Sequence, residues 1–129
     1  MSHPNADLVR KGFEAFATGD MAMLDQLMAD DATWHTPGRN PLAGDFRGKE
    51  AIFGNFAQLR QQTDSFEQDV HAILADDEHT VALVNVTVTR GGKTVTGQQA
   101  LVFHIVDGKA TEVWVAPTDQ YAFDELFAG

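Results

Sequence analysis

Two side chains in the sequence, His35 and Asp119, have the chemistry to move a proton. His35 lies in the segment ATWHT, and an imidazole exchanges its proton near neutral pH more readily than any other side chain. Asp119 follows an apolar segment close to the C-terminus. A carboxyl group at the mouth of an apolar pocket has its pKa raised by desolvation, so it can act as an acid or a base. Together these residues indicate acid/base catalysis that needs no cofactor.

Each residue also has a structural interpretation. Side chains alternate between the two faces of a strand, so if Trp34 points into a cavity, His35 points away from it unless Pro37 twists the strand. His35 would then be a hydrogen-bonded histidine at the rim or in the core. Asp119 could instead cap a closing helix, or pair with an arginine of the loop that follows His35. Both interpretations stay open for both residues.

The remaining histidines show no metal-binding spacing. His71 and His104 lie within strand-like segments, while His79 and His3 lie in a turn and in the N-terminal tail. Neither a His-x-His nor a His-Glu-x-x-His pattern occurs. The sequence has no Cys, which excludes disulfides, thiol catalysis and thiolate metal ligands. We therefore expect no metal and no cofactor.

The composition predicts one acidic folded domain, residues 1–129. Of these residues 43% are hydrophobic, enough for a core. Lys and Arg number 9 against 19 Asp and Glu, and the net charge of −10 repels nucleic acid and anionic membrane surfaces. No apolar run reaches the roughly 18 residues of a membrane span, and the N-terminus has no apolar signal core. We expect a soluble, cytoplasmic protein without a nucleic-acid or membrane partner.

Helices are expected first along the chain. Asn5 is the predicted cap of a first helix, which Gly19 ends in the left-handed conformation. Asp20 then caps a second helix, and a third helix begins at Lys49. The apolar face of the third helix consists of Ile52, Phe53, Phe56 and Leu59.

The second half of the chain has the pattern of strands. Segments rich in Val, Thr, Ile and Phe occur at 66–75, 80–90, 94–106 and 110–116. They are separated by DDEH, RGGK and VDGK, of which the last two are hairpin signals. A short strand at 32–36 precedes them, and the tail forms a closing helix with Thr118 as its candidate cap. This order predicts an α+β fold in which helices cover one face of a curved antiparallel sheet, with a cavity between the layers.

Two long segments, GDMAMLDQLMADDATWHTPGRNPLAGDFRGKEAI and GKATEVWVAPTDQYAFDELF, carry a family resemblance. The order of their parts is specific: Gly-Asp between two helices, Ala-Asp-Asp-Ala before the first strand, then the loop NPLAGDFRG. The chain resembles the SnoaL-like branch of the NTF2-like superfamily, to which the ketosteroid isomerases also belong. This resemblance implies a cone-shaped barrel, with the sheet wrapped on three N-terminal helices around a deep apolar pocket. It also implies a homodimer formed through the outer face of the sheet.

The resemblance implies roles for particular residues. In SnoaL-type polyketide cyclases an acidic residue occupies the position of Asp119, and the loop after the first strand crosses the mouth of the barrel. Asn40 and Leu42 would then form a lid. Apart from the resemblance, Gln98 and Gln99 lie on opposite faces of their strand, so one of them could offer a neutral amide to a ligand oxygen. The remaining ligand-binding candidates are Trp34, Phe53, Phe56 and Trp114. For the dimer face we expect Val81, Leu83, Val102 and Val113.

The groups of a steroid isomerase are missing from the matching positions. That reaction uses an Asp base together with a Tyr and a protonated Asp that hydrogen-bond the enolate oxygen. Here the base position is Thr36, the Tyr position is near Gly12, and the segment 100–103 that should carry the second Asp is apolar. We therefore do not expect ketosteroid isomerisation by this mechanism.

Two classes of function stay open. In the first, the chain is an acid/base isomerase, cyclase or dehydratase acting on a hydrophobic molecule, which requires Asp119 or His35 inside the cavity. In the second, it is a ligand-binding or dimeric interaction module without turnover. The second class predicts an apolar pocket in which no polar pair can share a proton.

Overall fold

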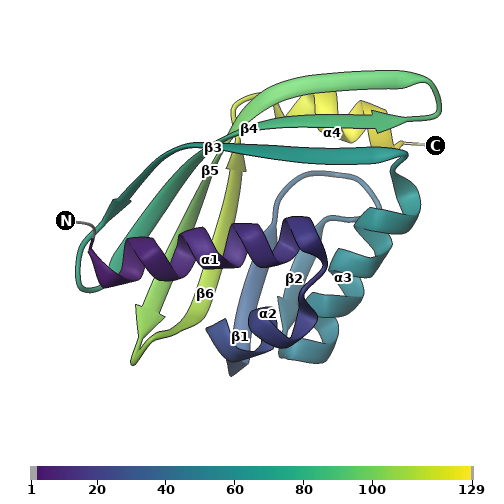
Figure 1. Cartoon of the computed structure of the whole chain (residues 1–129). Coiled ribbons are helices and arrows are strands. Elements are labelled where there is room, and N and C mark those ends of the chain that lie inside the picture. Colours follow the sequence, from purple (N-terminus) through teal and green to yellow (C-terminus); the bar gives the residue numbers. More distant parts are fainter. Residues whose placement is uncertain (1–2, 129) are drawn as a thin grey trace.

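The computed structural model describes residues 3–128, which form helices around one curved sheet (Figure 1). In chain order the elements are α1 (Pro4–Thr18), α2 (Met21–Leu27), β1 (Met28–Thr36), β2 (Gly44–Arg47), α3 (Lys49–Gln62), β3 (Ser65–Ala75), β4 (His79–Arg90), β5 (Lys93–Val106), β6 (Lys109–Pro117) and α4 (Gln120–Phe127). This order confirms the predicted α+β fold. Within the described residues no helix is long and apolar enough to cross a membrane.

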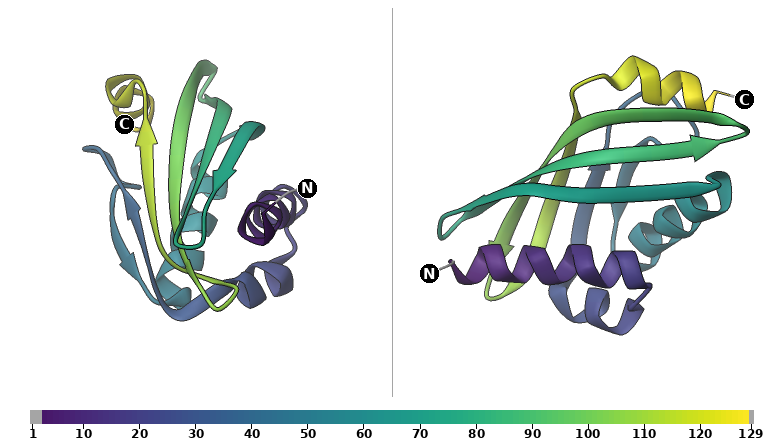
Figure 2. Two further views of the ribbon diagram at one scale, coloured as in Figure 1. Left: turned by 90° about the vertical axis from the view of Figure 1, so that its left-hand side faces the viewer. Right: turned by 45° about the horizontal axis from the view of Figure 1, so that its top comes forward.

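The six strands are arranged in the order β2-β1-β6-β5-β4-β3. Helix α1 packs against β3 and β4, α3 against β1 and β2, and α4 against β5. Figure 2 shows how the sheet curves, with α1 lying along β3 at one edge and α3 beside β1 and β2 at the other. Residues of α1, α3 and the strands line a pocket between the helices and the sheet.

The sheet is mixed rather than antiparallel throughout. Strands β3, β4, β5 and β6 form an antiparallel meander, as predicted, but β1 pairs with β6 in parallel. Residues 44–47, predicted as loop, form β2 and pair with β1. Strand β1 also begins at residue 28 rather than 32. The sequence pattern did not predict this start because two exposed acids, Asp30 and Asp31, separate the buried Met28 from the buried Ala32.

Most predicted helix ends are confirmed. Gly19 ends α1 with a φ of 75°, and the Asp20 carboxylate accepts a hydrogen bond from the N–H of Met23 at the start of α2. The predicted first cap is wrong. Helix α1 starts at Pro4, and the preceding His3 accepts a hydrogen bond from the N–H of Asn5. Proline suits this position because it has no N–H to leave unpaired.

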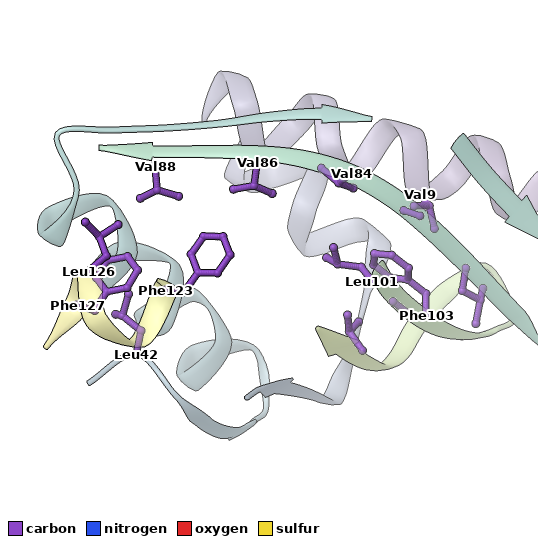
Figure 3. Packing of buried hydrophobic residues seen from close by; sticks show 14 residues of the cluster. Val9, Leu42, Val84, Val86, Val88, Leu101, Phe103, Phe123, Leu126 and Phe127 are labelled. Atoms are coloured by element: carbon purple, nitrogen blue, oxygen red, sulfur yellow. The ribbon is translucent and has the colours of Figure 1, made fainter. Parts of the chain in front are cut away.

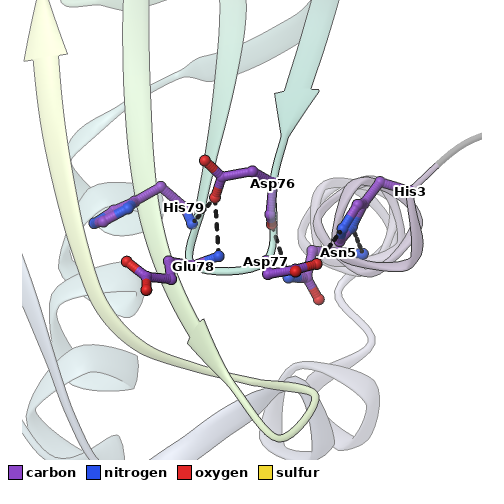
Figure 4. A network of polar contacts seen from close by, with 6 residues as sticks. All are labelled: His3, Asn5, Asp76, Asp77, Glu78 and His79. Atoms are coloured by element: carbon purple, nitrogen blue, oxygen red, sulfur yellow. Dashed lines mark hydrogen bonds and ion pairs between the residues drawn. The ribbon is translucent and has the colours of Figure 1, made fainter.

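The β3–β4 turn is tied to the start of α1 (Figure 4). The Asp76 carboxylate accepts hydrogen bonds from the N–H groups of His79 (2.8 Å) and Glu78 (2.9 Å), which lower the pKa of Asp76. The Asn5 side chain donates to the Asp76 carbonyl at 3.2 Å. One turn thus closes the β3–β4 hairpin and holds the first turn of α1.

Two hydrophobic clusters meet at Trp34. The larger cluster combines side chains of β4 with those of α4, as Figure 3 shows for Val86, Val88 and Phe123. The smaller cluster consists of Met28, Ala32, Ile52 and Phe56. Trp34 packs against both, and its ring makes edge-to-face contacts with Phe56 (4.9 Å between centroids) and Phe103 (6.5 Å). Trp34 therefore joins α3 to the sheet.

Candidate functional site

An apolar pocket of about 180 Å³ lies between the sheet and the helices. Its apolar walls include Phe13 and Phe16 of α1, Phe56 of α3, and Leu101 and Phe103 of β5. An engineered apolar cavity of about 150 Å³ in another protein binds benzene. The pocket is therefore large enough for a small ring compound, and its walls suit an apolar one.

The polar side chains of the lining are all neutral. They are Thr36, Asn40, Asn55, Gln68, Gln99 and Gln120. Among residues 3–128, no Asp, Glu, His, Lys, Arg or Tyr side chain lines this pocket. Within the same range no group of three or more His, Cys, Asp or Glu side chains is arranged to hold a metal ion. The lining can donate and accept hydrogen bonds, but it holds no ionisable side chain that could exchange a proton near neutral pH.

The predicted ligand-binding residues fall into two groups. Trp34, Asn40, Leu42 and Phe56 line the pocket together. Phe53 and Trp114 do not. Phe53 lies behind Phe56, with 6.1 Å between the ring centroids, and packs in the smaller cluster. Trp114 is 37% exposed on the outer face of the sheet, because its neighbours Val113 and Val115 point into the pocket.

His35 also lies on the outer face, as strand alternation from Trp34 predicted. Its Nδ1 is 2.7 Å from Oδ1 of Asp45, and its Nε2 is 2.6 Å from Oε2 of Glu112. Its ring stacks on that of Trp114 at 5.6 Å. Because ionised carboxylates only accept hydrogen bonds, both contacts form together only when the imidazole is protonated and each ring nitrogen donates. His35 thus connects β2, β1 and β6 from outside the pocket.

The charge of His35 follows from these two contacts. The hydrogen bond to Asp45 contributes most to raising the pKa of His35, and the hydrogen bond to Glu112 adds to it. Partial burial lowers the pKa by less than these two partners raise it.

Asp119 caps α4. Its Oδ1 accepts a hydrogen bond from the N–H of Ala122 at 3.1 Å, and the side chain is exposed and absent from the pocket lining. The helix thus takes its cap from Asp119, one residue after the predicted Thr118. Thr118 instead donates its hydroxyl to the carbonyl of Gln98 at 3.2 Å.

One carboxylate that sequence analysis missed, Asp124, fastens α4 to the loop after β1. Its Oδ1 accepts hydrogen bonds from the Asn40 side chain (2.7 Å), the Arg39 N–H (3.0 Å) and the Gln120 side chain (3.0 Å). Burial raises the pKa of Asp124, but these hydrogen bonds together outweigh it, so the pKa lies below its ordinary value. The only signal in the sequence is the spacing of Gln120 and Asp124, which places them on one helix face.

The loop after β1 is held at further points. The Asn40 side chain accepts a hydrogen bond from the N–H of Leu42 at 2.9 Å, and the Asn55 side chain of α3 donates to the Leu42 carbonyl at 3.1 Å. Asn40 and Leu42 therefore form a fixed part of the pocket wall in this structure. Of the two predicted glutamines, Gln99 lines the pocket, while Gln98 is exposed.

Comparison with known proteins identifies the family. The SnoaL-like domain matches residues 9–113, which is more than half of the chain. The chain belongs to the SnoaL-like family. One relative of this SnoaL-like protein is the uncharacterized protein Rv0034 of Mycobacterium tuberculosis, which is 29% identical over 124 residues and 95% of each chain.

Solved structures share its fold. Bal32a, from a soil-derived mobile gene cassette, is 36% identical, with a TM-score of 0.92 over 96% of each chain. An NTF2-like protein of Burkholderia pseudomallei is 20% identical, with a TM-score of 0.90 over 99% of this chain and 100% of its own. At that identity the likeness shows the fold alone. The NTF2-like fold predicted for this SnoaL-like protein is thereby confirmed.

The first prediction concerns the charge of His35. Its pKa, measured by NMR titration of the ring, should lie above the ordinary value of 6.5 and fall in an Asp45→Asn variant. Because the pKa is raised by folding, the contribution of His35 to stability is complete below the unfolded pKa and is lost as the pH rises through the folded pKa. Titration at or below 6.5 in the wild type would contradict the double hydrogen bond.

The second prediction concerns the helix cap that Asp119 provides. Replacing Asp119 by Ala should lower the free energy of unfolding by about 1 kcal/mol, because α4 loses its N-cap. The matched Asp119→Asn variant keeps a good capping side chain and should retain wild-type stability in urea unfolding. Equal stability of the Ala variant and the wild type would show that the cap contributes nothing.

Proposed function

We propose that this SnoaL-like protein binds a small, largely apolar molecule in the pocket, and that no pocket side chain acts as an acid or a base. The observation that supports this most is the lining itself, which combines aromatic and aliphatic walls with neutral amides and one threonine. Apolar surface supplies most of the binding free energy in such a site, while a few hydrogen-bonding groups fix the orientation of the ligand.

An acid/base enzyme is the weaker alternative. It requires His35 or Asp119 in the pocket, whereas His35 contacts carboxylates on the outer face and Asp119 caps a helix. The positions that match the groups of a steroid isomerase do line the pocket, but they are occupied by Thr36, Gly12 and the apolar Leu101 and Phe103. Proton transfer would have to rely on a ligand or solvent group. Binding without turnover needs no such addition.

The third prediction tests the pocket with 2-methylnaphthalene as a neutral probe. In an ¹⁵N-labelled sample, saturable binding should shift the signals of pocket residues such as Trp34 and Phe103. A Val115→Phe variant should bind at least about tenfold more weakly, because the larger ring takes up part of the pocket volume.

The matched control is Val106→Phe, which makes the same change at an exposed position of β5 and should leave the affinity unchanged. Both variants need a wild-type melting curve for the comparison to hold. Equal affinity of the Val115→Phe variant, or shifts confined to the outer face of the sheet, would rule out binding in this pocket.

We further propose that a second copy of the chain covers the outer face of the sheet. Leu74, Val81, Val102 and Trp114 lie opposite one another across β3, β4, β5 and β6. Leu83 beside them is 38% exposed, Leu74 is 59% exposed, and such a row of apolar side chains supports an interface between copies. Val113, which the sequence placed in this face, is 1% exposed and lines the pocket instead.

The fourth prediction is the state of assembly. Sedimentation at micromolar concentration should give the mass of a dimer, and Leu83→Glu should give a monomer because it places a carboxylate in the proposed interface. The matched control is Met21→Glu, at a similarly exposed position on α2, which should remain dimeric. A monomeric wild type, or a Leu83→Glu dimer, would argue against this interface.

A further inference from the structure

A second recess lies beside the apolar pocket. It has a volume of about 570 Å³ and is lined by the end of α1, the end of α3 and the start of β3. Several of its lining residues are exposed, so it opens to solvent: Ala17, Arg60, Asp64, Ser65 and Glu67. Among residues 3–128, those that line both spaces are Phe13, Phe16, Leu59, Phe66 and Gln68. The pocket and the recess therefore share one wall.

Phe16 contacts groups on both sides of this wall. Its ring makes edge-to-face contacts with Phe66 (6.0 Å between centroids) and with Phe56 (5.2 Å), which lines the pocket but not the recess. The Arg60 guanidinium, which lines the recess but not the pocket, lies 5.0 Å from the centroid of the Phe16 ring. The Phe16 ring therefore lies where the two spaces adjoin.

Arg60 holds Phe16 from the solvent side. Besides stacking on the ring, its guanidinium donates a hydrogen bond to the Phe16 carbonyl in the last turn of α1. Carbonyls in the last turn of a helix need partners from outside the helix, and a positive charge is favourable there. Rotating the Phe16 ring away breaks the cation–π contact and the aromatic contacts, but it breaks no backbone hydrogen bond of α1.

The loop after β1, on another side of the pocket, is held more firmly. Asp124 accepts hydrogen bonds from the Arg39 N–H and the Asn40 side chain. The Asn55 side chain donates to the Leu42 carbonyl. Moving this loop away from the pocket would break these hydrogen bonds together. Rotation of one aromatic side chain is a smaller and faster change than displacement of such a loop.

We infer that apolar molecules enter and leave the pocket through the shared wall, with the Phe16 ring as the gate and Arg60 as the side chain that holds this gate closed. The inference rests on the proposed binding function and adds how access to the pocket is controlled. Arg60 does not line the pocket, so it stabilises the closed wall equally with and without a ligand. It therefore changes the rates of binding and release, and it leaves the affinity unchanged.

The test measures the association and dissociation rate constants of 2-methylnaphthalene by stopped-flow fluorescence. The Arg60→Met variant keeps an unbranched apolar side chain but removes the guanidinium. Both rate constants should rise by about threefold, the size expected for the loss of one exposed cation–π contact. Their ratio, which is the dissociation constant, should keep its wild-type value.

A second variant should have the opposite effect. Ala17 is exposed and lines the recess but not the pocket. In an Ala17→Trp variant the indole should obstruct the recess and lower both rate constants at unchanged affinity. Because Ala17 and Arg60 are both exposed, each variant should fold as the wild type does.

Arg90 offers a matched control because it makes the same two kinds of contact elsewhere. Its guanidinium lies 5.9 Å from the centroid of the Phe127 ring and donates to the Leu126 carbonyl at 2.9 Å. Phe127 is 5% exposed and lines the pocket but not the recess. The Arg90→Met variant thus loses the same contacts away from the shared wall, and both of its rate constants should equal those of the wild type.

The outcomes separate this inference from the proposed function. Wild-type rate constants in both the Arg60→Met and the Ala17→Trp variants would overturn the gate while pocket binding stands. Equal acceleration in the Arg60→Met and Arg90→Met variants would also overturn it, because general loosening of the fold would then account for the rates. If an Asp124→Ala variant alone accelerates exchange, ligands pass under the loop after β1 and the gate is wrong. If 2-methylnaphthalene does not bind, the proposed function fails and this inference fails with it.

Discussion

The alternation of side chains along each strand gives this sheet one face toward the pocket and one away from it. In β1 it turns Trp34 and Thr36 inward and His35 outward, and in β6 it turns Val113 and Val115 inward and Trp114 outward. A slip of one residue in either strand would exchange these sets and bring charged groups into the apolar core. The neutral pocket therefore depends on register.

Hydrogen bonds to carboxylates fasten β1 to its neighbouring strands and the loop after β1 to α4. On the outer face, His35 joins carboxylates on β2 and β6. Beyond the end of β1, the Asp124 carboxylate accepts hydrogen bonds from the following loop and from Gln120 of α4. The Asp124 carboxylate thus serves structure outside the pocket, while two of its neutral partners, Asn40 and Gln120, belong to the pocket lining.

Local signals made much of this fold predictable. The turns RGGK and VDGK place residues at positive φ, with Gly92 at 81° and Gly108 at 77°, and such turns are encoded within a few residues. The Gly19–Asp20 boundary between helices is equally local. Alternation also predicted which way His35 points, although it left open whether the strand end was twisted.

The missed features depend on contacts between distant parts of the chain. The parallel pairing of β1 with β6 has no counterpart in the pattern of either strand, because alternation looks the same for both directions. Asp124 looks like any exposed helix acid until Asn40 is placed beside it. Asp119 had two possible roles, and only the position of α4 could decide between them.

The parallel β1–β6 pair has a consequence for the order in which the protein can fold. It pairs Thr33 with Glu112, which lie far apart in the sequence. The part of the pocket wall formed by β1 and β6 is therefore complete only when both distant segments have come together. Bringing such distant segments together costs chain entropy before any contact compensates for it, which slows folding relative to a chain of local contacts. Until then β1 exposes an unpaired edge, and its apolar Trp34 has lost the sheet side of its packing. Folding of the β3–β6 meander can precede this step, but a binding-competent pocket cannot.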